Sequence, residues 1–481
     1  MDIKNLSIVE LHNKLKNKEI SVSQLVDQTY KNLAVNLNSN FLITLFDNPA
    51  DKKLDDLFDE KNLLSGIPYV TKDNFWTKDK LTTAGSKILS NFYPTDDATI
   101  TKKLYQAKTV LMGKAAMDEL GMGGTGLFSY NGIIRSPFDE ERIAGGSSSG
   151  SAYAVAKGLV SFATGTDTGD SIRKPASFNG IVGFKPTYGS LSRYGVIPYA
   201  PSLDHVGFFT RTVEDMAIVC DATFGYDKKD FTSIDNPHKF YENINNLNPK
   251  IKFGYIKNIQ NYIKGSLKKE YENIFKKIKA DGFEIKELDF KKELLDAIPA
   301  VYMMISFSEA VSTHSNLDGI NFGLRVEDEG DDYIDVIKKS RASGFGRNVK
   351  KRFVIGSYQL RKENQELILT KSKKVRTLII EELNKLYEQV DVLILPPALD
   401  VVPKISDVMG TDIEDRIEDN EVFLQDLLIL ANFNGMPSIT IPFIKQNNLP
   451  IGINLCSKPK MDLLTFQAAK YLENLINKED K

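Results

Sequence analysis

Residues 144–186 read AGGSSSGSAYAVAKGLVSFATGTDTGDSIRKPASFNGIVGFKP, and glycines and small hydroxyl residues gather in them at two places, Gly145–Ser151 and Gly165–Ser171. Between these places lie a helix-like stretch, Ser151–Gly158, and an apolar run, Leu159–Ala163. Glycine lets backbone N–H groups converge on one point, because it adopts conformations that other residues resist. A serine placed there attacks a carbonyl carbon while the N–H groups hold the oxyanion. The stretch therefore predicts two Gly-rich turns that bring serines and N–H donors together.

Several other interpretations of this stretch remain open from the residues alone. It is also typical of a flexible linker, whereas a phosphate-binding loop requires a Gly-Lys-Ser/Thr that the chain lacks. Residues 146–150 match the G-x-S-x-G turn of α/β-hydrolases, which requires a downstream histidine. The candidates are His205, His238 and His314, and none lies in a context that marks it as a base. Residues 171–174 match S-x-x-K, but the same pattern occurs twice more and its companion motifs are absent.

A chain with four histidines can still activate a serine by using a lysine as the base. Burial must then lower the lysine pKa from about 10.4 toward roughly 7–8, so that the amine is neutral. Lys72 is a candidate, because it follows the apolar, strand-like run in GIPYVTKDNF, residues 66–75. The alternative is an ordinary surface lysine, and sequence chemistry alone does not choose between the two.

The patterns of apolar and helix-capping residues outside 144–186 predict one large α/β unit. Residues 1–35 indicate two helices, each begun by a capping box, and the order strand, helix, strand over 251–288 favours parallel pairing. No internal repeat or Pro/Ser-rich linker divides the chain. We expect a single domain over 1–481, with an N-terminal helical segment over 1–40, a catalytic core over 60–220 and a surface excursion over 300–350.

Composition narrows the function. Lys and Arg number 62 against 64 Asp and Glu, for a net charge of −2, so the chain lacks the basic excess of a protein that grips nucleic acid by itself. Two cysteines, Cys220 and Cys456, fit a reducing compartment. The N-terminus has no signal-peptide core, and no apolar run approaches 18 residues. We expect a cytoplasmic protein that does not enter a membrane.

Three segments of the chain resemble the amidase signature family. Gly145–Ser151 matches the pattern G-G-S-S-x-G-S, and Asp167–Ala176 matches D-T-G-x-S-I-R-x-P-A. Upstream, Ile67–Asp73 matches I-P-x-x-x-K-D. The two serines at 147 and 171 are 24 residues apart, and Lys72 precedes the second by 99, spacings that suit the family. The resemblance implies an α/β domain with a central mixed β-sheet flanked by helices on both faces.

The same resemblance implies the roles of the catalytic residues. Ser171 is the nucleophile and Lys72 the base, and Ser147, which follows a cis peptide bond in the family, relays the proton between them. The oxyanion hole is made of backbone N–H groups, those of Thr168, Gly169, Asp170 and Ser171. No metal is implied.

Within the family, the resemblance is to the glutamine-hydrolysing A subunits of tRNA-dependent amidotransferases, carried by segments such as Lys185–Gly189, Gly344–Gly346 and Gly435–Pro437. It implies that Arg352 binds the α-carboxylate of glutamine and Asp426 its α-ammonium, with Tyr302 lining the pocket. Ammonia passes to B and C subunits, which use ATP and Mg²⁺ and hold most of the mischarged tRNA, so this chain binds no cofactor. The alternatives are a stand-alone amidase acting on another small amide and a non-catalytic scaffold subunit.

The chain departs from the family pattern at three places. Asp170 stands where the family usually has glycine, and because a carboxylate there opposes an oxyanion, we expect its side chain to point away. His205 stands where glutamine is usual. Gly124–Leu127 replaces a Ser-rich stretch near the pocket. These departures bear on rate and specificity and leave Lys72, Ser147 and Ser171 in place.

Overall fold

The computed structural model describes residues 4–49, 52–260, 263, 265–409 and 427–478. Eleven strands among these residues form one sheet in the order β1-β3-β2-β4-β6-β5-β10-β11-β9-β7-β8. The strands are β1 (Leu42–Leu45), β2 (Pro68–Lys72), β3 (Val110–Ala115), β4 (Phe162–Asp167), β5 (Val182–Lys185), β6 (His205–Thr210), β7 (Lys252–Ile256), β8 (Glu284–Leu288), β9 (Val392–Leu395), β10 (Ser438–Gln446) and β11 (Leu449–Ser457).

The sheet is mixed, as expected. Strand β2 runs parallel to β3 and β4, and β7 runs parallel to β8 and β9, whereas the pairs between β4 and β9 are antiparallel. The predicted strand, helix and strand over 251–288 are β7, α9 (Gly265–Ala280) and β8, and their parallel pairing is confirmed. This is the right order for a crossover connection, because the helix carries the chain back to the starting edge.

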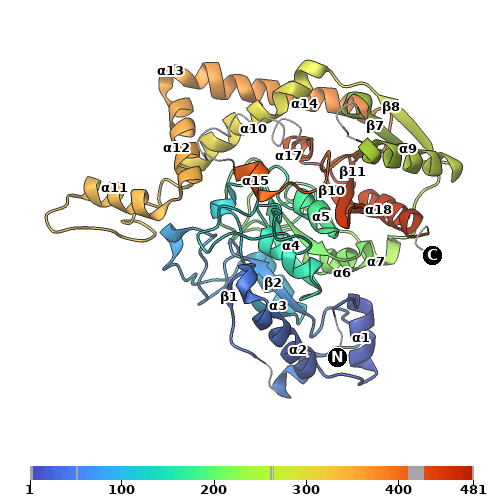
Figure 1. The fold of residues 1–481 in the computed structure, drawn as a ribbon, viewed down its shortest axis with the longest axis horizontal. Coiled ribbons are helices and arrows are strands. Elements are labelled where there is room, and N and C mark those ends of the chain that lie inside the picture. The colour runs from blue at the N-terminus through green and yellow to red at the C-terminus, as the bar shows by residue number, and fades with distance from the viewer. Residues whose placement is uncertain (1–3, 50–51, 261–262, 264, 410–426, 479–481) are drawn as a thin grey trace.

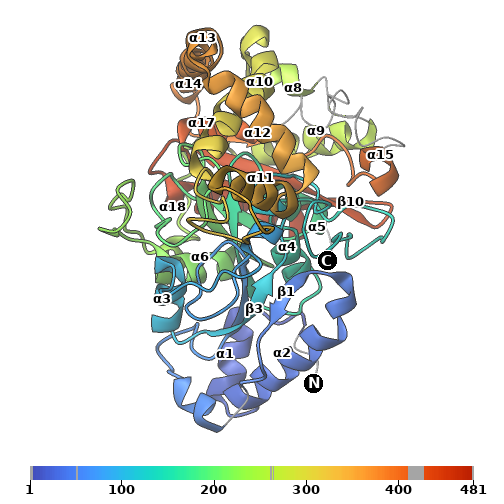
Figure 2. The same cartoon turned by 90° about the vertical axis from the view of Figure 1, so that its left-hand side faces the viewer.

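Helices cover both faces of the sheet, and the expected α/β class is confirmed. Helices α6 and α18 lie on one face and α4 and α5 on the other (Figure 2). The remaining helices are α1 (Ile8–Lys16), α2 (Val22–Val35), α3 (Thr99–Gln106), α7 (Phe240–Asn243), α8 (Lys257–Gln260), α10 (Lys292–Thr313), α11 (Tyr333–Gly344), α12 (Arg347–Leu360), α13 (Lys362–Gln365), α14 (Lys371–Tyr387), α15 (Ile405–Met409) and α17 (Ile429–Asn434). Those on the two faces are α4 (Ser149–Ala156), α5 (Arg173–Asn179), α6 (Val213–Thr223) and α18 (Asp462–Asn477).

The two N-terminal helices begin where their capping residues predict. Ser7 accepts a hydrogen bond from the backbone of Glu10, whose carboxylate accepts one from Ser7 N in return. Ser21 and Gln24 make the same reciprocal pair at the start of α2. Each pair satisfies two N–H groups that have no partner inside the helix. Both helices pack beside the β1 end of the sheet (Figure 1).

The segment expected as a surface excursion, 300–350, divides in the structure. Residues up to Thr313 belong to α10, where Val301 and Ile305 are buried in the core against α12 and α14. The expectation fails there because the Gly- and Asp-rich composition begins only after this helix. The part that projects from the body of the molecule is α11 with the loop before it (Figure 1).

The sequence predicts no segment with the length and apolar character of a membrane helix, and helix α10 is an exception to that prediction. Its 22 residues meet that criterion, the only helix among the described residues to do so. More than half of its most apolar window is buried inside the fold, a property of core helices in globular proteins.

The sheet brings two distant segments to one edge. Strands β2 and β4 are parallel neighbours, with Tyr69 opposite Phe162 and Val70 opposite Ala163. Their carboxyl ends, Lys72 and Asp167, therefore lie side by side at the same edge of the sheet. Ligand-binding residues commonly follow the carboxyl ends of strands in such sheets.

Candidate active site

Lys72 is the last residue of β2 and is fully buried. Its ammonium nitrogen lies 2.8 Å from each of three hydroxyl oxygens, those of Ser147, Ser148 and Thr166. Thr166 O accepts a fourth, longer hydrogen bond at 3.3 Å. The lysine expected to be a base therefore sits among hydroxyl groups, and one of them is the serine expected to be the proton relay.

Burial lowers the pKa of Lys72 to about 7, because removing the ammonium from water disfavours the charged form. Nearby carboxylates oppose this shift, with Asp118 first and Asp167 next. A pKa near 7 leaves a large fraction of neutral amine at physiological pH, and a general base is most effective when its pKa lies near the working pH.

Ser147 lies just before α4 and is 1% exposed. The peptide bond between Gly146 and Ser147 is cis, as in the family that the sequence resembles. A side chain on Gly146 has no room, because a Cβ atom there would lie 2.1 Å from Asp118 Oδ2. Asp118 in turn donates its N–H to Ser147 O over 3.1 Å. The glycine and the buried aspartate thus fix the backbone on both sides of the serine.

Asp118 also organises the loop that faces this serine. Its carboxylate accepts hydrogen bonds from the N–H groups of Thr125, Gly126 and Phe128, at 3.0–3.1 Å. Burial raises the pKa of Asp118, and these three donors act in the opposite direction. This buried carboxylate explains how the Gly-rich loop 123–126 holds its shape without a Ser-rich sequence.

Ser171 lies in the turn between β4 and α5 and is 4% exposed. Within the part of the chain that the structure describes, no hydrogen bond joins Ser171 to Ser147, so the network that starts at Lys72 ends at Ser147. The N–H groups of Thr168, Gly169 and Ser171 donate to no acceptor among the same residues. These N–H groups are available to a substrate oxygen, which is what an oxyanion hole requires.

A buried ion pair holds the 168–171 turn in place. Arg173 contacts both carboxylate oxygens of Asp167, at 2.9 and 3.0 Å, and neither side chain is exposed. Arg173 also donates to Gly169 O over 2.7 Å, and Asp167 accepts from Ile172 N over 3.0 Å. Burial alone would raise the pKa of Asp167, but Arg173 holds that pKa below its usual value. The charged pair therefore ties both ends of the 168–171 turn to one anchor.

Tyr302 from α10 and Arg352 from α12 line a small pocket with Gly169 and Asp170. Arg352 is 9% exposed, and its Nη1 donates to Tyr199 Oη over 3.0 Å. Among the described residues it has no carboxylate within 4.0 Å. A buried guanidinium without a counter-ion is costly, which favours an anionic ligand at this place. Asp426, the residue expected to bind an ammonium group, lies outside the described residues.

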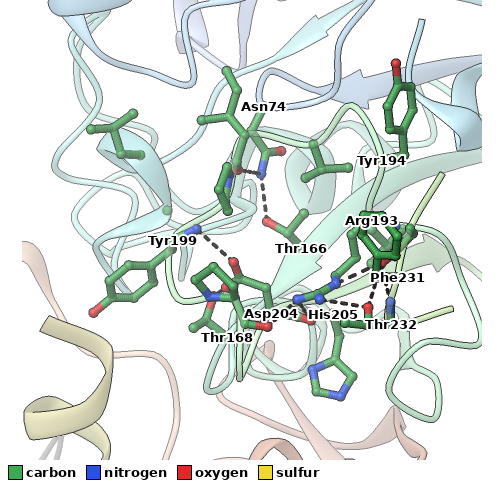
Figure 3. Close-up of a pocket in the computed structure, with 18 of the residues that line it drawn as sticks. Asn74, Thr166, Thr168, Arg193, Tyr194, Tyr199, Asp204, His205, Phe231 and Thr232 are labelled. Carbon is green, nitrogen blue, oxygen red and sulfur yellow. Dashed lines mark hydrogen bonds and ion pairs between the residues drawn. The ribbon is translucent and has the colours of Figure 1, made fainter. Parts of the chain in front are cut away.

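A second cavity, of about 340 Å³, is lined by Thr166 and Thr168 among other residues (Figure 3). Thr168 donates to Asp204 Oδ1 over 2.6 Å, and the same carboxylate group accepts from Tyr199 N over 2.8 Å. Arg193 lines the cavity, and its Nη2 donates a hydrogen bond to Thr232 Oγ1 over 2.8 Å. The cavity thus shares the oxyanion turn with the small pocket, and Asp204 holds that turn from this side.

His205 does not take part in the lysine and serine cluster. It is 3% exposed, and its Nδ1 lies 2.7 Å from Leu203 O. Burial holds its pKa well below the usual value, so the ring is neutral. His314 is likewise buried, with its pKa lowered to about 3, and His238 packs against Phe224 and Phe240. The structure gives none of the three the position of a base for Ser171.

Sequence reasoning missed several residues of the site. Thr166 accepts from both Lys72 and Asn74, yet in the sequence it is only one more member of a Gly-rich run. Arg173 stands out in the sequence only as a member of the longer motif Asp167–Ala176. No local signal marks Thr166 or Asp118, because their partners are distant in sequence.

Comparison with known proteins agrees with this geometry. The chain matches the amidase family profile over residues 24–465. It is 40% identical, over 98% of each chain, to the A subunit of glutamyl-tRNA(Gln) amidotransferase from Mycoplasma genitalium, and also 40% identical over 98% of each chain to that of Mycoplasma pneumoniae. The fold is similar to the crystal structure of the same kind of subunit, that of the Thermotoga maritima glutamyl-tRNA(Gln) amidotransferase, with a TM-score of 0.81, 31% identity and coverage of 98% and 95%. A match over nearly the whole chain, together with the buried lysine and the serines around it, places this chain in the amidase family.

Proposed function

We propose that this chain is the glutamine-hydrolysing A subunit of a tRNA-dependent amidotransferase. The observation that carries the proposal is the buried amine of Lys72, 2.8 Å from Ser147 Oγ, in a chain whose similarity to amidotransferase A subunits extends over 98% of its length. A lysine held neutral beside a serine suits amide hydrolysis, because a serine hydroxyl must lose its proton to attack a carbonyl carbon.

The catalytic steps of this proposal run from Lys72 through Ser147 to Ser171. The neutral amine of Lys72 takes the proton of Ser147, which takes that of Ser171, and Ser171 Oγ bonds to the side-chain carbonyl carbon of glutamine. The N–H groups of Thr168, Gly169, Asp170 and Ser171 bind the resulting oxyanion. The proton then returns through Ser147 to the amide nitrogen, the C–N bond breaks and ammonia leaves. Water attacks the glutamyl ester in the same way, releasing glutamate and restoring Ser171.

The pocket supplies groups for the two charges of an amino acid. Arg352 binds the α-carboxylate, since it is a buried cation without a described counter-ion. Tyr302 forms the wall against Gly169, with its ring within 3.2 Å of a Cβ built there. Asp426 binds the α-ammonium group. A cation and an anion in the substrate site would select α-amino acids over simple amides.

The ammonia is used by partner subunits, B and C, in the cytoplasm. They would use ATP and Mg²⁺ to activate a mischarged tRNA, Glu-tRNA(Gln) or Asp-tRNA(Asn), and would hold most of it. The balanced charge of this chain supports that division, because RNA binding by its own surface would require a basic excess.

The test is ammonia release from glutamine, with the purified chain alone and with its B and C subunits, for wild type and Ser171→Ala. We expect release to rise with the partners and to vanish in the variant. If glutamine is inert and another small amide is cleaved, the chain is a stand-alone amidase. If complex activity with glutamine is the same in Ser171→Ala as in wild type, the chain is a scaffold subunit.

A further inference from the structure

A second ion pair lies directly beside the proposed nucleophile. Asp170 precedes Ser171, and Lys174 follows one helical turn later in α5. Lys174 Nζ lies 2.7 Å from Asp170 Oδ2, and the two side chains are 11% and 15% exposed respectively. Both line the small pocket that also contains Tyr302 and Arg352. This charge pair is therefore part of the wall that a substrate would touch.

The direction of the Asp170 side chain is set by two neighbours. Lys174 N donates to Asp170 O over 2.9 Å, which fixes the aspartate backbone at the start of α5. On the opposite side, a Cβ built on Gly124 would lie 4.0 Å from Asp170 Oδ2, so the carboxylate extends toward the 123–125 loop. The side chain thus points along the pocket wall, while the backbone N–H of the same residue belongs to the oxyanion turn.

This position has an electrostatic consequence. A full negative charge one residue from the nucleophile repels the negative charge that develops on the substrate oxygen during attack. The repulsion is strong here, because the Asp170 side chain is largely buried and buried charges are screened weakly. A cation bound to the carboxylate offsets most of it. The family pattern avoids the conflict with a glycine at this position, whereas this chain carries both the acid and, one turn later, a base.

We propose that Lys174 is a positioning residue for amide hydrolysis: it binds the Asp170 carboxylate and so neutralises a charge that would otherwise oppose the oxyanion formed at Ser171. The proposal rests on Ser171 being the nucleophile. Lys174 acts through Asp170, so it is needed only while residue 170 is charged. That dependence separates this role from ordinary packing and from direct substrate binding.

The experiment is a double-mutant cycle on the chain with its B and C subunits, with kcat and KM measured for glutamine. Lys174→Gln should lower kcat about 10- to 100-fold, because it removes the cation that lies 2.7 Å from the Asp170 carboxylate. KM should change less than kcat. Lys174→Arg should keep near-wild-type kcat, because arginine also pairs with a carboxylate. Adding Lys174→Gln to Asp170→Asn should change kcat by less than about threefold, because the charge that Lys174 pairs with is then absent.

Lys31→Gln is the matched control, because Lys31 makes the same i,i+4 pair with Asp27 on α2, at 2.6 Å, on an exposed surface. An equal fold loss of kcat when Lys174→Gln is introduced into wild type and into Asp170→Asn would overturn the proposal, as would unchanged kcat in Lys174→Gln. If Lys174→Gln does not fold, the comparison of the double variant with Asp170→Asn decides, since a further loss of activity there contradicts a role through Asp170. A wild type that releases no ammonia would contradict the proposed function instead.

Discussion

Lys72 Nζ and Ser147 Oγ are 2.8 Å apart, and both side chains are closed to solvent. The contact joins the end of a strand to a turn 75 residues later in the chain. The surrounding hydroxyl groups solvate the amine without carrying a charge that would keep it protonated. The arrangement therefore allows the amine to exchange a proton with Ser147 near neutral pH.

The pH dependence of glutamine hydrolysis should report the pKa of Lys72. The base is active only when neutral, and its pKa is about 7. We expect kcat/KM to rise about tenfold per pH unit below this value and to level off above it. The measurement is ammonia release between pH 5.5 and 9. A flat profile over this range would exclude Lys72 as the base, and Lys72→Arg should be inactive throughout because a guanidinium stays charged.

Ser147 and Ser148 provide a matched pair of substitutions, since Lys72 Nζ lies 2.8 Å from both hydroxyl oxygens. Ser148 donates onward to Thr166 O over 3.2 Å, which assigns its proton to the backbone. Ser147→Ala should lower kcat about 10²- to 10⁴-fold, the usual range for a lost proton-transfer group. Ser148→Ala should lower kcat far less. Equal losses would show that the relay is not specific to Ser147.

Arg352 should determine the affinity for glutamine. Arg352→Met removes the buried cation and should raise KM about 10- to 100-fold, the effect of losing charge-assisted hydrogen bonds. The control is a glutamine analogue without the α-carboxylate. Wild type should discriminate strongly between the two substrates and the variant should not. If discrimination survives in Arg352→Met, another group binds the carboxylate.

Much of the fold could be predicted from the sequence, because the local periodicity of apolar residues indicates its helices and strands. The two helices predicted over 1–35 correspond to α1 and α2, and the predicted strand, helix and strand over 251–288 correspond to β7, α9 and β8. Strands β5, β6 and β11 were not predicted, since central strands buried on both faces show no alternation. Strand β10 continues past Pro442, because the register shifts at that proline.

The same distinction applies to the site, where residues in local motifs were predicted and residues brought in by tertiary structure were not. Lys72, Ser147 and Ser171 were predicted from motif resemblance, and their catalytic roles stay predictions. The residues that surround them were not accessible, because sheet order alone brings Thr166 beside Lys72. Burial of Lys72 is likewise a tertiary property, which a chain with 62 Lys and Arg residues does not reveal.

The pair of Asp167 and Arg173 should be important for stability. Breaking a buried ion pair leaves one charge without a partner in the core, at a cost of about 3–5 kcal/mol. Asp167→Asn should therefore lower the free energy of unfolding by about this amount, measured by denaturant titration. Lys239→Gln, which breaks an exposed pair with Glu242, is the control and should change little. A loss of activity in Asp167→Asn without a loss of stability would contradict a structural role.

Gly169 should tolerate no side chain while Tyr302 is present. A Cβ at this position would lie 3.1 Å from two Tyr302 ring carbons, and Tyr302 is one of the buried residues of α10. Because the ring has little freedom, the 168–171 turn must shift in Gly169→Ala and carry its N–H donors away from the oxyanion. We expect kcat to fall about 100-fold, a usual cost of misplaced catalytic groups.

Gly124→Ala is the control, since a Cβ there meets only an ordinary contact at 4.0 Å. Tyr302→Leu makes room for the added methyl group, so kcat in the double variant should exceed that of Gly169→Ala. Additive losses would show that the turn does not depend on this contact.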